Sequence, residues 1–71
     1  MTYQAIFERA NDGTIWGYIP EVPGVTGSGD TLEQAKKSVA EGLHAWLEEA
    51  RTEGTEIPKP ATIGAFAIDA A

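Results

Sequence analysis

Carboxylates are the most abundant side chains in this chain that could do chemistry, because Asp and Glu together number 11 while His numbers 1 and Cys 0. Metal-dependent hydrolysis of a phosphodiester needs carboxylates that converge on a metal ion from separate elements. Glu8 and Asp12 instead border one expected hairpin, and Asp30 and Glu33 fit the cap of a helix. Without cysteine there is no thiolate nucleophile, disulfide or zinc–cysteine site. We therefore predict no catalytic residues, no metal site and no cofactor, and expect that the protein is not an enzyme.

Two other features could suggest chemistry. His44 could act as a general base or a ligand, but neither a nucleophile nor a second ligand accompanies it in the sequence. We interpret it as a histidine on a helix flank, partly exposed or packed at an interface. Gly24, Gly27 and Gly29 form a glycine-rich stretch without the lysine–hydroxyl pair of a phosphate-binding loop. We assign these glycines to turn geometry.

Aromatic side chains offer the better candidates for binding. Trp16, Tyr18 and Phe66 could form an exposed patch, although ordinary core packing would explain them equally well. The partner-binding residues that we predict are Trp16 and Tyr18, on the sheet face away from the helix, and Glu21, on the rim of the loop at residues 20–24.

The formal net charge of −6 narrows the class of partner. Nucleic acids are polyanions that are bound through basic surfaces, so direct binding of nucleic acid is not expected. An acidic surface suits a basic protein partner, and it also keeps a small domain soluble. The N-terminus lacks the basic and apolar regions of a signal peptide, and no apolar run is long enough to span a membrane. We expect a cytoplasmic protein with no membrane association.

The elements that must position these residues follow from periodicity and turn chemistry. Alternating side chains predict strands at residues 3–9, 14–19 and 25–28, with a hairpin turn at residues 11–13 between the first two. Asp30, or alternatively Thr31, caps a long helix that ends near Gly54. Its apolar face consists of Leu32, Ala35, Val39, Leu43, Trp46, Leu47 and Ala50. The fold class is α+β: a small, mostly antiparallel sheet with one long helix on one face, in the order β-β-β-α-β, as a single domain over residues 1–71.

The predicted last strand, at residues 62–68, is apolar on both faces. It therefore either lies inside the sheet or pairs with another chain. A chain of 71 residues without disulfides is marginally stable alone, which favours oligomerisation. We predict a homodimer or tetramer, with Ile63, Phe66 and Ile68 at the interface.

Residues 20–35 read P-E-V-P-G-V-T-G-S-G-D-T-L-E-Q-A, and this run resembles the HicB-like antitoxin family. The similarity extends outward to a Tyr-x-x-Ile-Phe strand at Tyr3, an Asp-Gly hairpin, and a Gly-x-x-Ile-Pro-x-Pro run that begins at Gly54. The resemblance covers nearly the whole chain. It implies a partial RNase H-like fold of three strands, a helix and a fourth strand.

In that family the domain neutralises HicA, a small basic toxin that cleaves mRNA, by occluding its active site. The resemblance thus implies an antitoxin-like protein-binding module. Many members add a C-terminal operator-binding segment, whereas this sequence ends at Ala71, so we expect a single-domain member without it. Two alternatives remain: an orphan oligomeric scaffold or regulatory protein of the same fold, and, ranked last, a metal-dependent nuclease that would use Glu8 or Asp12.

Overall fold

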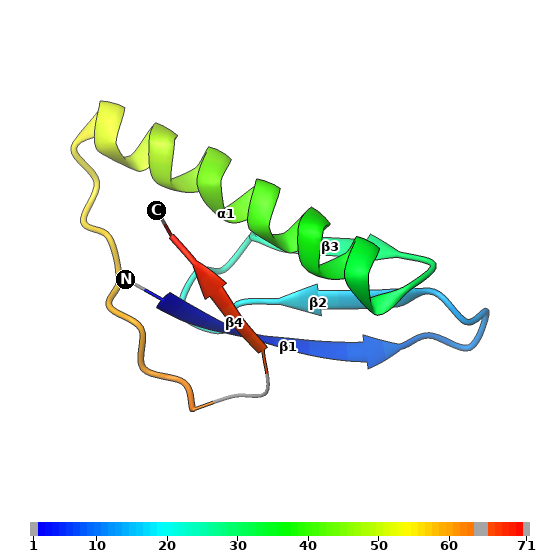
Figure 1. Ribbon diagram of the computed structural model, residues 1–71. Coiled ribbons are helices and arrows are strands. Elements are labelled where there is room, and N and C mark those ends of the chain that lie inside the picture. The colour runs from blue at the N-terminus through cyan, green and yellow to red at the C-terminus, as the bar shows by residue number, and fades with distance from the viewer. Residues whose placement is uncertain (1, 64–65, 71) are drawn as a thin grey trace.

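The computed structural model describes residues 2–63 and 66–70, and within them one helix packs on a four-stranded antiparallel sheet. Figure 1 shows the helix lying along one face of the sheet, with the opposite face uncovered. The strand order is β3-β2-β1-β4, so β3 and β4 are the edges. The predicted α+β class and element order are confirmed. The elements are β1 (Thr2–Arg9), β2 (Ile15–Tyr18), β3 (Thr26–Gly29), α1 (Leu32–Glu53) and β4 (Phe66–Asp69).

The hairpin between β1 and β2 follows the local sequence as predicted. The Asp12 carboxylate accepts a hydrogen bond from the Thr14 backbone N–H at 2.9 Å, which closes a turn of the kind that Asp favours. Gly13 has a φ of 91°, a left-handed conformation that glycine adopts without steric cost. The resulting register places Phe7 opposite Gly17 and Glu8 opposite Trp16.

The core lies between the helix and the covered face of the sheet. Tyr3 and Ala5 of β1 are fully buried there, and Ile68 of β4 joins them from the edge. The helix contributes Val39, Leu43 and Leu47 at the predicted spacing. The segment between β2 and β3 completes this core with Ile19, Val22 and Val25.

The helix begins and ends on local signals. Thr31 is the N-cap, and its Oγ1 accepts a hydrogen bond from the Gln34 backbone N–H at 3.2 Å. Gln34 Oε1 in turn accepts from the Asp30 backbone N–H at 2.8 Å, one residue before the N-cap, so the arrangement is a capping box displaced by one residue on its return bond. Of the two caps considered, Thr31 is therefore correct, and Gln34 rather than Glu33 completes the box. The C-cap is Gly54, with a φ of 72°, as predicted.

Gly27 and Gly29 allow the helix to approach β3, which corrects their assignment to turn geometry. Both lie within β3, and a Cβ atom built on Gly27 would lie 2.7 Å from the backbone carbon of Ser38. A Cβ on Gly29 would lie 2.9 Å from the backbone nitrogen of Ala35. Gly24, with a φ of 96°, does occupy a turn.

The fourth strand is shorter and lies later in the chain than predicted. Thr62 and Ile63 precede it in an irregular segment, while residues 64 and 65 of the predicted strand lie outside the described residues. Within residues 2–63 and 66–70, strand β4 pairs with β1 alone, with Tyr3 opposite Ile68, so it is an edge strand of the described sheet. Its burial alternates, because Phe66 and Ile68 face the core side while Ala67 and Asp69 are exposed, so β4 is not buried on both faces.

Candidate protein-binding surface

The uncovered sheet face carries two of the three predicted partner-binding residues. The rings of Trp16 and Tyr18 stack with their centroids 5.6 Å apart and their planes inclined by 25°. Trp16 is 37% exposed, which is high for so large an apolar ring, and Tyr18 is half-buried. Ile6, directly opposite Tyr18 on β1, is also half-buried and extends the apolar surface. Strand alternation thus places an aromatic pair where no element of the described chain covers it.

Phe66 does not belong to this patch, which corrects the suggestion that it might join Trp16 and Tyr18. It lies opposite Ala5, on the face that the helix covers. Its ring meets Phe7 edge-to-face, with centroids 5.3 Å apart, and Lys36 Nζ lies 5.3 Å from its centroid. These rings help to line a depression of about 200 Å³ at one end of the core.

Glu21 has an intramolecular role that the sequence did not indicate. Its Oε2 accepts hydrogen bonds from the backbone N–H groups of Ala61 at 2.7 Å and Thr62 at 3.1 Å, and its Oε1 accepts one from Thr62 Oγ1 at 2.7 Å. Donors to the ionised carboxylate favour the charged form, the Ala61 N–H most strongly, and they lower the pKa of Glu21. The carboxylate therefore clamps the connector between α1 and β4 onto the segment that follows β2.

A second contact holds the same connector. The Tyr3 hydroxyl donates a hydrogen bond to the Pro58 carbonyl oxygen at 2.5 Å. Burial raises the pKa of Tyr3, and the negative charge of Glu21 raises it further. The clamp at Glu21 and this hydrogen bond fix both halves of the connector.

Two residues considered for catalysis, His44 and Asp12, make structural contacts in the fold. His44 is exposed, and its Nε2 lies 3.0 Å from the Asp69 carbonyl oxygen, so it links the helix to β4. Asp12 is engaged in the hairpin turn, where the Thr14 N–H lowers the pKa of its carboxyl. Among residues 2–63 and 66–70, no three His, Cys, Asp or Glu side chains are placed to hold a metal ion. No helix in that part of the chain is long and apolar enough to cross a membrane.

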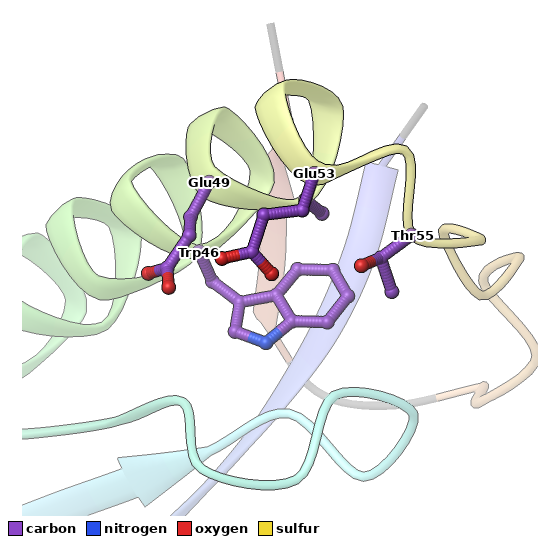
Figure 2. A pocket seen from close by; sticks show the side chains of 5 residues that line it. Trp46, Glu49, Glu53 and Thr55 are labelled. Atoms are coloured by element: carbon purple, nitrogen blue, oxygen red, sulfur yellow. The ribbon is translucent and has the colours of Figure 1, made fainter.

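A further pocket lies beside the last turns of α1. It has a volume of about 230 Å³ and is lined by Trp46, Glu49, Ala50, Glu53 and Thr55. Figure 2 shows the indole of Trp46 beneath the helix, with Glu53 and Thr55 directed toward it. Trp46, predicted to lie on the core face of the helix, packs partly against the core and also borders this pocket. The spacing of residues 46, 49, 50 and 53 was the signal that could have identified the pocket, because it places them on one helical face.

The fold and this surface define a small α+β domain with an acidic, partly aromatic exterior. The chain belongs to the UPF0150-like family, whose family model matches residues 2–58. It is 42% identical over 45 residues to a UPF0150 protein of Synechocystis, an alignment that covers 63% of this chain and 62% of that protein. It is 34% identical over 59 residues to an uncharacterized 14.9 kDa protein of Haemophilus phage HP1, covering 83% of this chain and 44% of the phage protein. The chain spans less than two thirds of the length of both curated relatives.

Solved structures share the fold. The N-terminal domain of the Burkholderia pseudomallei antitoxin HicB superposes with a TM-score of 0.80 at 20% identity, covering 89% of this chain and 75% of that one. A structure of antitoxin HicB from the same organism gives a TM-score of 0.78 at 20% identity, covering 89% of this chain and 48% of that one. The family match and the shared fold confirm the resemblance to HicB-like antitoxins that the motif run indicated.

Proposed function

We propose that the chain is an antitoxin-like binding module that neutralises a small basic, mRNA-cleaving toxin by covering its active site. The observation that carries this proposal is the fold likeness to the N-terminal domain of antitoxin HicB over 89% of the chain. The net charge of −6 supports a basic partner, because complementary charge accelerates encounter and disfavours wrong partners. In this proposal the protein acts in the cytoplasm without enzymatic activity and without direct contact to nucleic acid.

The toxin-binding surface in this proposal is the uncovered sheet face around Trp16 and Tyr18. Stacked aromatic rings are suited to the centre of an interface, because they bury a large area and lose little side-chain freedom. Glu8 lies opposite Trp16 in the register and is exposed, so it adds an acidic group beside the ring. Glu21 contributes to the rim, where its own hydrogen bonds fix the backbone of the adjoining connector.

We also propose self-association through Ile63, which precedes β4, and through the outer edge of that strand. Ile63 is fully exposed in the chain, which leaves a large apolar side chain available for a second copy. Phe66 is half-buried, whereas Ile68 lies in the core of its own chain. In a homodimer or tetramer Ile63 would therefore make the side-chain contact, and β4 would contribute an edge of the sheet.

The test is a pull-down and an RNA-cleavage assay with the small basic protein encoded by the neighbouring gene. We expect the purified chain to bind that protein, to suppress its cleavage of mRNA in proportion to the complex formed, and to bind less tightly as salt rises. The absence of a basic neighbour, or cleavage that continues in the presence of excess chain, would contradict the proposal. A defined oligomer that leaves the cleavage unaffected would favour the scaffold alternative. RNA cleavage by the chain alone with magnesium or manganese would favour the nuclease alternative.

A further inference from the structure

The pocket beside the end of α1 combines one aromatic wall with two carboxylates. Trp46, Glu49 and Glu53 follow one another at spacings of three and four, so all three project from the same side of the helix. In Figure 2 the carboxylate of Glu53 lies above the indole, and Thr55 stands at the far end of the ring. The cavity between them measures about 230 Å³.

The aromatic wall is held in place before anything binds. Trp46 is half-buried and packs against the core cluster, which restricts the orientation of its ring. The remaining part of the indole borders the cavity. Indole is the aromatic side chain that attracts a cation most strongly through its face. The ring is therefore preorganised for a cationic group.

The two carboxylates lie where they oppose helix stability. Glu49 and Glu53 are four residues apart, a spacing at which like charges repel, and they lie at the helix end where the backbone dipole is negative. Both are exposed, and in the described part of the chain neither has an ion-pair or hydrogen-bond partner. A cation bound between the two carboxylates would reduce both their mutual repulsion and their unfavourable interaction with the helix dipole.

The size of the pocket suits a single side chain. Sites for drug-sized ligands occupy about 300–1,000 Å³, more than this cavity offers. Among cationic side chains, the planar guanidinium of arginine can stack on a ring and still donate hydrogen bonds to carboxylates, whereas an ammonium group cannot stack. We propose that this pocket binds an arginine side chain of the basic protein partner, stacked on Trp46 and hydrogen-bonded to Glu49 and Glu53. This inference rests on the proposed function for the identity of the partner.

The chemistry of the pocket can be tested on the full chain without the toxin. A blocked Gly-Arg-Gly peptide is titrated against the isotope-labelled protein by NMR, and the Trp46 indole N–H is followed together with the backbone amides of residues 49–55. We expect shifts concentrated on these groups, weaker shifts with lysine in place of arginine, and none with citrulline, which keeps the shape but lacks the charge. Equal shifts with citrulline, or shifts spread evenly over all acidic residues, would overturn the proposal.

Matched variants locate the site. Glu49→Gln and Glu53→Gln should each weaken binding of the arginine peptide about two- to fivefold, the range of a partly exposed ion pair. Glu33→Gln removes the same charge at the opposite end of the helix and should leave the affinity unchanged. Trp46→Phe retains a weaker ring and should reduce the affinity, with circular dichroism to verify that it folds. Equal weakening by all three Glu→Gln variants would overturn the proposal, because it would reveal only a general charge effect.

Measurements of toxin binding distinguish a wrong assignment of the pocket from a wrong proposed function. If the chain does not bind the basic neighbour at all, the proposed function fails, while the peptide titration still decides the chemistry of the pocket. If the toxin binds the double variant Glu49→Gln, Glu53→Gln as tightly as the unmodified chain, the proposed function stands and the assignment of the pocket to that partner is overturned. We expect the double variant to bind toxin about fourfold or more weakly.

Discussion

Glu21 and Thr62 are joined by two hydrogen bonds across 41 positions of sequence, at 2.7 Å from Thr62 Oγ1 and at 3.1 Å from its backbone N–H. Together with the hydrogen bonds from Ala61 to Glu21 and from Tyr3 to Pro58, this contact fixes the connector between α1 and β4. Because β4 delivers Ile68 to the core, the position of the connector bears on the stability of the whole domain.

Replacing Glu21 with Gln should destabilise the fold. The amide nitrogen that replaces one carboxylate oxygen would face hydrogen-bond donors, and the remaining oxygen would be a weaker acceptor. Hydrogen bonds to charged groups contribute about 1.5–3 kcal/mol when removed from buried sites, and this rim is partly solvated, so we expect a loss of about 1–2 kcal/mol. Urea unfolding at neutral pH measures it. Glu41→Gln, on the exposed side of the helix, is the matched control and should change stability by less than about 0.5 kcal/mol.

The same clamp predicts a dependence of stability on pH. The pKa of Glu21 in the folded chain lies below its ordinary value of 4.5, so the folded state favours the ionised carboxylate. Its contribution is fully present above pH 4.5 and is lost as the pH falls through the folded pKa. Asp12, whose pKa is also lowered, acts in the same direction. The free energy of unfolding should therefore fall on acidification. In Glu21→Gln, the free energy of unfolding should differ less between pH 6 and pH 3 than it does in the unmodified chain. An unchanged difference in that variant would contradict the role of Glu21.

Features governed by neighbouring residues could be read directly from the sequence. The turn at Gly13 and the helix end at Gly54 depend on side chains and backbone conformations within four positions, whereas the N-cap was predicted only as Asp30 or Thr31. The core face of the helix follows from the 3.6-residue period, and Val39 and Leu43 are buried as predicted. The positions of Trp16 and Tyr18 on the uncovered face follow from strand alternation.

Features that depend on distant segments could not be predicted in this way. No local pattern indicates that Gly27 lies against the backbone of the helix, because that contact exists only once the two layers pack. The clamp between Glu21 and the connector likewise joins segments whose proximity is set by the path of β4. The start of β4 was misplaced because small and apolar residues at 62–68 fit a strand equally well at several positions.

Adding a single methyl group at Gly27 should be strongly destabilising. The new Cβ would lie within 3 Å of backbone atoms of Ser38 and Val39, and backbone atoms can move aside only by shifting the helix. Overpacking of this kind costs about 1–3 kcal/mol, and we expect Gly27→Ala to lie at the upper end of that range. Thermal unfolding compares it with Ser28→Ala, which alters the neighbouring residue on the uncovered face and should be nearly neutral. Equal melting temperatures for the two variants would contradict the close approach of helix and strand.

Truncating Trp16 should separate binding from stability. Its ring is 37% exposed and stacks on Tyr18, so Trp16→Ala removes partly buried apolar surface and should lower the free energy of unfolding by about 1–3 kcal/mol, which urea unfolding measures apart from binding. If the uncovered face binds the toxin, the same substitution should weaken binding about fivefold or more, as truncation of a central aromatic residue does at protein interfaces. Isothermal titration with the toxin measures the affinity, and Glu48→Ala on the exposed side of the helix is the control. If Trp16→Ala binds the toxin with unchanged affinity while the double variant Glu49→Gln, Glu53→Gln binds it more weakly, the toxin contacts the end of the helix and not the sheet. If both variants bind the toxin more weakly, the toxin contacts both surfaces, and its arginine contributes to a larger interface centred on the stacked rings.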